Sequence, residues 1–102
     1  MEVKKIKDFS EFYQFYLGEH SDKTNRILHF LGTCFLLAVL TYAIVTANYG
    51  LIWLCPLFGY SFAWTGHFVF EKNRPATFKQ PIYSLMCDFL MWWQLLTRKI
   101  YF

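Results

Sequence analysis

Three histidines are the residues of this sequence best suited to bind a metal ion. His20 lies in a polar segment, His29 lies near the start of a long apolar run, and His67 lies near the end of a second apolar run. Neutral imidazole is a good ligand for iron and zinc, and three protein ligands that leave one position open are typical of a catalytic metal site. The sequence has no nucleophile-elbow motif, phosphate-binding glycine loop or dinucleotide fingerprint. Hydrolase and nucleotide-binding interpretations are therefore weakened.

Two helical stripes place these histidines beside small residues that allow close packing. The stripes consist of Asn25, His29 and Gly32 in one run and of Gly59, Ala63, His67 and Glu71 in the other. If the two runs pair as antiparallel helices with the stripes facing each other, His29, His67 and Glu71 converge. His20 can then close the group from the preceding polar segment. We therefore predict a site formed by the three histidines and Glu71, a ligand set suited to iron or zinc.

Other polar residues near these positions have both a functional and a structural interpretation. Asn25 and Asp88 are predicted to lie beside the metal ligands and orient them, although Asp88 can instead pair with Arg74 or Arg98. Lys72 and Arg74 are predicted to meet a substrate carboxylate, or alternatively to bind anionic lipid headgroups. The histidines themselves can also act as interfacial anchors or as hydrogen-bond donors between helices. The spacing alone leaves these alternatives open.

The composition indicates a membrane protein of one domain, residues 1–102. The chain is 56% hydrophobic and 23% aromatic, which is far more apolar than an ordinary soluble domain. Its net charge is +3, and its basic residues form short clusters beside apolar runs, which does not suit nucleic-acid binding. Cys34, Cys55 and Cys87 lie inside apolar segments without zinc-type spacing, so we interpret them as packed thiols.

Two uncharged runs predict a transmembrane helical hairpin. About twenty apolar residues, at a rise of 1.5 Å each, cover the hydrocarbon core of a bilayer. One run extends from Ile27 to about Ala47 and the other from Leu51 to Phe70. The short turn between them requires the two helices to be antiparallel. The predicted fold is therefore all-α, with an integral membrane hairpin that carries the histidines at one membrane face.

Two further helices are expected on either side of the hairpin. A capping-box-like pattern at Asp8 and aromatic residues at helical spacing predict an amphipathic helix that ends near Gly18. It either lies on the membrane or packs against the other helices. A third apolar segment, Ile82 to Leu96, predicts a membrane-embedded C-terminal helix. Because this segment is short and contains Asp88, it spans obliquely, inserts part-way or lies along the interface.

Positive charges gather at the free ends of the hairpin. They are Lys4, Lys5, Lys7, Lys23 and Arg26 before the first run, and Lys72, Arg74 and Lys79 after the second. Cytoplasmic segments carry an excess of such residues, so both free ends are predicted to be cytoplasmic. No cleavable signal precedes the first run, and the expected location is a bacterial inner membrane or the endoplasmic reticulum.

Several sequence segments resemble one known family. They are FYQFYL at residues 12–17, His20 followed by Asn25, Leu28, His29 and Gly32, and the most specific run, GHFVFEKNRPA at residues 66–76. The family is typified by the fungal endoplasmic-reticulum 2-hydroxy fatty acid dioxygenase. A short bacterial-type branch also shares CDFLMWW, residues 87–93 here. The fungal enzyme is longer between its two histidine motifs, and a further histidine there has no counterpart in this chain.

The resemblance implies an iron(II) enzyme of fatty acid α-oxidation, which uses O₂ to shorten a 2-hydroxy fatty acid by one carbon. His20, His29 and His67 are similar to the family's histidines, and Glu71 is similar to its glutamate. The leading hypothesis is that the histidines hold Fe(II) with Glu71 as a fourth ligand or an orienting residue, while Lys72 or Arg74 steers the substrate carboxylate. One alternative is a non-enzymatic membrane scaffold or subunit with a structural histidine cluster. Another is haem ligation by His29 and His67.

Overall fold

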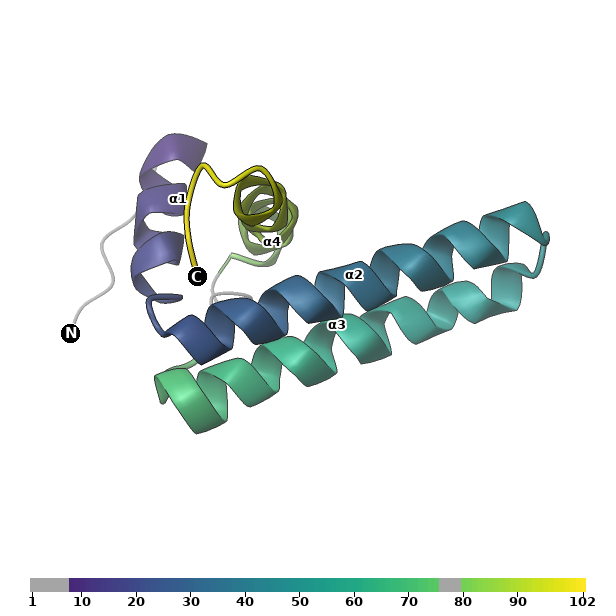
Figure 1. The fold of residues 1–102 in the computed structure, drawn as a ribbon, viewed down its shortest axis with the longest axis horizontal. Coiled ribbons are helices and arrows are strands. Elements are labelled where there is room, and N and C mark those ends of the chain that lie inside the picture. The colour runs from purple at the N-terminus through teal and green to yellow at the C-terminus, as the bar shows by residue number, and fades with distance from the viewer. Residues whose placement is uncertain (1–7, 76–79) are drawn as a thin grey trace.

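The computed structural model describes residues 8–75 and 80–102, and within these ranges the protein is all-helical. Helices account for 79% of the described residues, which contain no strand. In chain order the elements are α1 (Phe9–Gly18), α2 (Lys23–Val45), η1 (Tyr49–Trp53), α3 (Leu54–Thr65), η2 (Gly66–Glu71) and α4 (Pro81–Leu96) (Figure 1). The predicted all-α class is confirmed. The charges predicted to orient the hairpin at Lys4, Lys5, Lys7 and Lys79 lie outside the described residues.

The amphipathic helix α1 buries its aromatic face against α4. The Asp8 side chain caps the helix by accepting a hydrogen bond from the Glu11 backbone N–H at 2.7 Å. Aromatic side chains from α1 and apolar side chains from α4 then form one buried cluster, whose members are Phe12, Tyr13, Tyr16, Cys87, Met91 and Leu95. Of the two expected environments for this helix, the structure shows the one in which it packs against the protein's own helices.

The two central helices, α2 and α3, lie side by side and run in opposite directions (Figure 1). Close contact between them depends on glycine. A Cβ atom built on Gly32 would lie 2.7 Å from Phe62 Cβ, and one built on Gly66 would lie 1.9 Å from Asn25 Oδ1. Real Cβ atoms do not approach other atoms so closely. The prediction that Gly32 allows a neighbouring helix to approach is therefore confirmed.

The returning segment of the hairpin changes its helical pitch twice. It begins as the 3₁₀ turn η1, continues as α3 and ends as the π-helical turn η2. A π-turn has one extra residue, which rotates the following side chains relative to an α-helix and is frequent at functional sites. Lys72 ends the turn in the left-handed conformation, with φ of 59°. The uninterrupted second membrane helix predicted from the sequence is thus divided into three parts.

Among the described residues, one helix is long and apolar enough to be a candidate membrane span. This helix is α2, with 23 residues, and only 22% of its most apolar window is buried in the protein. The predicted membrane topology of the whole hairpin remains a prediction.

The C-terminal helix α4 runs across the hairpin instead of alongside it. In Figure 1 it is seen nearly end-on beside α1, whereas α2 and α3 lie along the horizontal. It packs on both α1 and α2. Its 16 residues extend about 24 Å, which is less than the roughly 30 Å of a bilayer's hydrocarbon core. Which of the three expected membrane arrangements this helix adopts therefore stays a prediction.

Replacing Gly32 with alanine should destabilise the hairpin. The added methyl group overlaps Phe62, and overpacking of this kind costs about 1–3 kcal/mol in the free energy of unfolding. The matched control is Gly18→Ala, because a Cβ atom at Gly18 meets nothing within 4 Å. Thermal unfolding in detergent should show a lower midpoint for Gly32→Ala alone. Equal midpoints for the two variants would contradict the described helix contact.

Candidate metal centre

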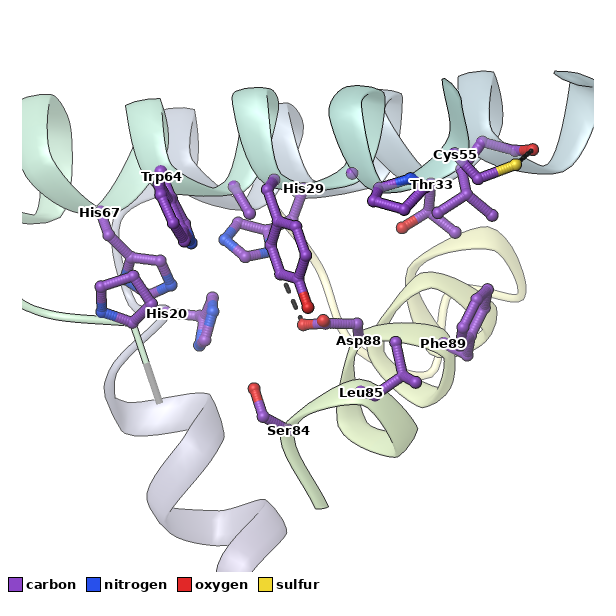
Figure 2. A pocket seen from close by; sticks show the side chains of 16 residues that line it. His20, His29, Thr33, Cys55, Trp64, His67, Ser84, Leu85, Asp88 and Phe89 are labelled. Atoms are coloured by element: carbon purple, nitrogen blue, oxygen red, sulfur yellow. Dashed lines mark hydrogen bonds and ion pairs between the residues drawn. The ribbon is translucent and has the colours of Figure 1, made fainter. Parts of the chain in front are cut away.

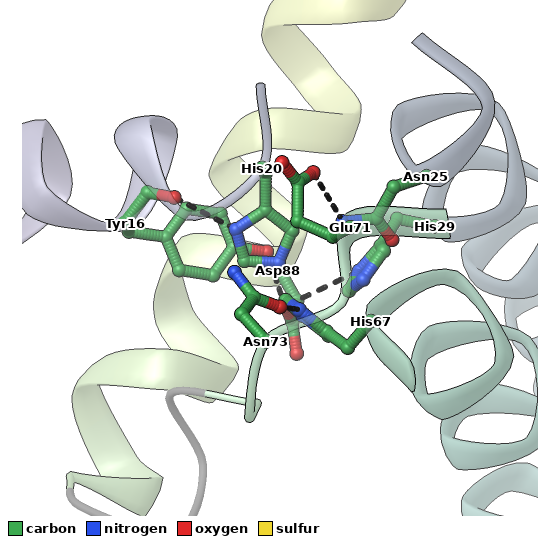
Figure 3. A network of polar contacts seen from close by, with 8 residues as sticks. All are labelled: Tyr16, His20, Asn25, His29, His67, Glu71, Asn73 and Asp88. Carbon is green, nitrogen blue, oxygen red and sulfur yellow. Dashed lines mark hydrogen bonds and ion pairs between the residues drawn. The ribbon is translucent and has the colours of Figure 1, made fainter. Parts of the chain in front are cut away.

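The three histidines converge at the polar end of the hairpin. His20 comes from the loop after α1, His29 from α2 and His67 from η2, and their exposed fractions are 1%, 7% and 1%. One potential ligand nitrogen from each lies within 4.8 Å of the others. The rings are roughly perpendicular to one another, with centroid separations of 4.4, 4.4 and 5.0 Å. Figure 3 shows the three imidazoles gathered around one point.

Each imidazole has its Nδ1 atom near an oxygen atom outside the cluster. The pairs are His20 with the Tyr16 carbonyl at 2.7 Å, His67 with Asn73 Oδ1 at 2.6 Å, and His29 with Asp88 Oδ1 at 3.9 Å. An imidazole that donates its Nδ1 proton to oxygen keeps a lone pair on Nε2. The Nε2 atoms of His20 and His29 are buried and have no hydrogen-bond partner. Buried polar atoms are rarely left unpaired, so these two nitrogens suit a bound metal ion.

Burial keeps the cluster in the neutral form that metal binding requires. The pKa of His20 is lowered to about 3, mainly because burial removes solvent and in part because of the neighbouring His67, while the hydrogen bond to the Tyr16 carbonyl opposes these effects. His20 is therefore uncharged near pH 7. A neutral imidazole has a free lone pair for a metal, so no proton has to be displaced when the ion binds.

Glu71 binds the loop that carries His20. Its carboxylate accepts hydrogen bonds from Ser21 Oγ at 2.9 Å, the Asp22 backbone N–H at 2.9 Å and Asn25 Nδ2 at 3.0 Å. Burial raises the pKa of Glu71, but these three hydrogen bonds outweigh that effect and leave the pKa below its usual value. The metal-ligand cluster found among the described residues comprises the three histidines without Glu71. These contacts fit an orienting residue better than a fourth ligand.

The two residues predicted to support the ligands both lie beside the cluster. Asn25 donates to Glu71, is fully buried and packs against Gly66 of η2. Asp88 of α4 lies next to His29 and accepts a short hydrogen bond from the Tyr16 hydroxyl. Burial raises the pKa of Asp88 to about 7, although the hydrogen bond from Tyr16 works in the opposite direction. Within the described part of the chain, Asp88 therefore lies beside the neutral His29 and forms no ion pair with an arginine.

The two predicted carboxylate-steering residues lie at the surface. Lys72 and Arg74 are exposed just after η2, and neither lines the cavity between the hairpin and α4. Lys72 is instead the residue at which η2 ends, and its backbone has the left-handed conformation. Their contact with a substrate stays a prediction.

A cavity of about 240 Å³ extends from the histidines between the hairpin and α4. Its polar end contains the three histidines and Asp88, and Figure 2 shows Thr33 and Cys55 toward its other end. Most of the remaining lining is apolar, including Leu36, Ala63, Trp64, Leu85 and Phe89. The site therefore combines a metal-binding end with a largely apolar extension.

Two residues of the site were not predicted. Asn73 accepts from His67 through Oδ1, while its Nδ2 donates to the Glu19 carbonyl at 3.0 Å, so it connects η2 with the His20 loop. Its backbone N–H also donates to the His67 carbonyl at 3.0 Å. Tyr16 stacks on His20 with a centroid separation of 3.9 Å. The available signal for Tyr16 was its position four residues before His20, in the last turn of α1. For Asn73 the spacing gave no signal, because the left-handed Lys72 precedes it.

The comparisons with known proteins identify the family of this chain. Residues 6–100 match a family profile described as 2-hydroxy-palmitic acid dioxygenase Mpo1-like. The chain belongs to this family. No curated protein and no solved structure matches it significantly. The resemblance noted in the sequence is thereby confirmed, and all three histidines of this Mpo1-like chain fall inside the matched range.

Asn73→Ala should weaken metal binding roughly 10- to 100-fold, which is the usual effect of removing a partner that orients a ligand histidine. The variant loses the oxygen that receives the His67 Nδ1 proton and the bond to the loop of His20. Metal titration of detergent-purified protein measures the change. Asn48→Ala, at the far end of the hairpin, is the control and should bind metal like the unmodified protein. Unchanged affinity in Asn73→Ala would refute the orienting role.

The metal-free protein should lose stability as the pH falls below about 6.5. His20 has a folded-state pKa of about 3, whereas an unfolded histidine titrates near 6.5, so only the unfolded state binds this proton between the two values. Proton uptake therefore favours unfolding throughout that window. Thermal midpoints between pH 7 and pH 4 should fall less steeply for His20→Gln than for the unmodified chain. Parallel slopes would contradict burial of a neutral imidazole.

Proposed function

We propose that this protein is an iron(II)-dependent dioxygenase that shortens 2-hydroxy fatty acids by one carbon. The observation that carries the proposal is the convergence of three buried neutral imidazoles at one end of an apolar cavity, in a chain of the Mpo1-like family. In the overall reaction the bond between C1 and C2 breaks, C1 leaves as CO₂ and C2 becomes the new carboxyl carbon. O₂ accepts the four electrons released, and water is the remaining product.

The donor set suits Fe(II), which His20, His29 and His67 would hold through their Nε2 atoms. When bound, the ion supplies the sites at which the acid's hydroxyl and carboxylate oxygens and O₂ meet. The protein's own residues fix the geometry: Tyr16 and Asn73 orient two of the rings through Nδ1. The Tyr16 hydroxyl directs its proton to Asp88, which lies against the third ring. The apolar walls exclude water from the tail of the acid.

The proposal places the hairpin in a lipid bilayer with the histidines near its cytoplasmic face. Large apolar side chains are exposed along the hairpin, among them Phe35, Tyr42, Val45, Leu57 and Phe68. Exposed apolar surface of this extent marks contact with lipid or with another protein. α2 has the length and composition to cross, and α4, which runs across the hairpin, would then lie near the interface. A lipid-soluble acid could thus reach the cavity from the bilayer.

Two alternatives fit the geometry less well. A purely structural histidine network should pair its buried nitrogens, whereas two Nε2 atoms here have no partner. Haem bound between His29 and His67 needs space for a porphyrin between the two rings. Their centroids are 5.0 Å apart, and His20 lies 4.4 Å from each of them, so that space is filled.

The activity is tested by incubating iron-loaded protein with 2-hydroxypalmitic acid in air. We expect O₂ consumption and the acid one carbon shorter, with His67→Ala losing both together with the bound iron, because one of three ligands is missing. Asn48→Ala should retain both. Full iron occupancy without conversion of any 2-hydroxy fatty acid would refute the enzymatic proposal, and the absence of bound metal would refute the site.

The membrane arrangement is tested by cysteine accessibility. Asn48→Cys at the hairpin turn and Tyr101→Cys near the C-terminal end should react with a membrane-impermeant maleimide from opposite sides of the bilayer. Tyr101 is exposed, and its backbone carbonyl accepts from Arg26 close to the histidine end of the hairpin. The single-cysteine variants are made in a chain whose three natural cysteines are replaced by alanine. Labelling of both positions from the same side would contradict a spanning hairpin.

A further inference from the structure

We propose that a stripe of small residues on α3 forms the floor of a groove for the aliphatic tail of the acid, and that Gly59 sets how long a tail the groove accepts. This inference rests on the proposed function and deepens it. The stripe consists of Cys55, Gly59 and Ala63, spaced four residues apart on α3, and it leads to His67 near the start of η2; all four residues line the cavity. Residues at this spacing lie on one face of a helix. The groove therefore follows α3 directly away from a metal ligand.

The polar end of the cavity identifies which end of the ligand binds there. The Nε2 atoms of His20 and His29 are buried, unpartnered and part of the cavity lining. Next to them lies the half-buried carboxyl group of Asp88. Away from this end the walls become apolar, so a ligand held at the histidines by a polar head must extend along α3 with an apolar chain. An aliphatic carboxylic acid has this distribution of polarity.

The helix rise gives the depth of each position in the stripe. With 1.5 Å per residue, Ala63 lies about 6 Å from His67 along the helix, Gly59 about 12 Å and Cys55 about 18 Å. An extended aliphatic chain advances roughly 1.2 Å per bond, close to the advance of an extended peptide backbone, so Gly59 lies beside roughly the tenth carbon of an extended tail. A side chain at position 59 would therefore obstruct long tails, and one at position 63 would obstruct shorter tails as well.

The side chains around position 59 leave little space for a larger residue. A Cβ atom built on Gly59 would already lie 3.2 Å from Leu36 Cδ1 of α2. On the opposite side of the cavity lie Leu85 and Phe89 of α4 (Figure 2). A leucine at position 59 would therefore have to extend into the groove.

One side of the groove is exposed at the surface of the protein. Three lining residues keep substantial exposure: Tyr60 at 41%, Trp64 at 38% and Leu85 at 49%. The volume of about 240 Å³ is also smaller than the roughly 300–1,000 Å³ of sites that enclose a ligand of moderate size. A long tail would thus rest on the floor of the groove with one side facing outward, which suits a ligand that arrives from lipid.

The groove can be mapped with a 2-hydroxy fatty acid that carries a photoreactive diazirine at its tenth carbon. The iron-loaded protein is placed in lipid nanodiscs without O₂, so that the acid is not consumed. We expect labels on α3 near Gly59 and on the facing turn of α2 near Leu36, and excess unlabelled 2-hydroxypalmitic acid should remove them. Labels spread over the outer surface of the hairpin, for example on Leu57 and Phe68, and unaffected by the competitor would overturn the proposal.

Substitution tests the role of Gly59 in tail length. Gly59→Leu should lower the affinity for the 16-carbon acid relative to the 8-carbon acid by roughly tenfold or more, a typical effect of a misfit in an apolar pocket. Ala63→Leu should weaken binding of both acids. Ser61→Leu is the matched control, because Ser61 is exposed on the same helix and does not line the cavity, and it should preserve the ratio. An unchanged ratio of the two affinities in Gly59→Leu would refute the proposal. If Gly59→Leu does not fold, the diazirine labelling pattern tests the proposal instead.

The two proposals fail in different ways. An acid that labels the groove but is not consumed in air would leave the groove in place and remove the proposed reaction. An acid that is shortened in air while its label falls outside the stripe would retain the reaction and remove the role of Gly59.

Discussion

The packing of three imidazoles against one another in a buried site is the constraint on which the rest of this structure depends. Two of the rings are oriented by an oxygen within hydrogen-bond distance of Nδ1, a backbone carbonyl for His20 and an amide for His67, and the Asp88 carboxyl lies 3.9 Å from Nδ1 of His29. The two hydrogen bonds fix both the tautomer and the direction of Nε2 in His20 and His67. Without a ligand, the buried Nε2 atoms of His20 and His29 are left without hydrogen bonds, which is unfavourable. A metal ion would relieve that cost.

The surrounding fold can be understood as the means of holding these rings together. Gly66 lets η2 approach Asn25 of α2, and the π-helical turn positions His67 at the end of the hairpin. Glu71 then binds the loop that carries His20, so three separate segments are connected at one point. Helix α4 covers the site from the side and brings Asp88 to His29. The same helix completes the apolar cavity, so metal site and groove share a wall.

Much of this arrangement was predictable from residue spacing. Helical periodicity places His29 and Gly32 on one face of α2, and the short turn requires an antiparallel partner, so convergence with His67 followed. The role of Asn73 was not predictable, because a π-turn and a left-handed Lys72 displace it from any regular helical register. The sequence pattern also treated residues 51–70 as one continuous helix, since hydropathy does not report changes in pitch. The sequence pattern could not determine whether Glu71 binds a metal ion or the loop that carries His20, because either role requires only a carboxylate at that position.

The most direct test of the central claim is X-ray absorption at the iron edge of the protein loaded with one Fe(II) per chain. The account predicts the multiple-scattering signature of three imidazoles around a single iron, and it predicts that each of the variants His20→Ala, His29→Ala and His67→Ala loses this signature together with the bound iron. A spectrum without imidazole scattering, or one that all three substitutions leave unchanged, would contradict a site built from these histidines.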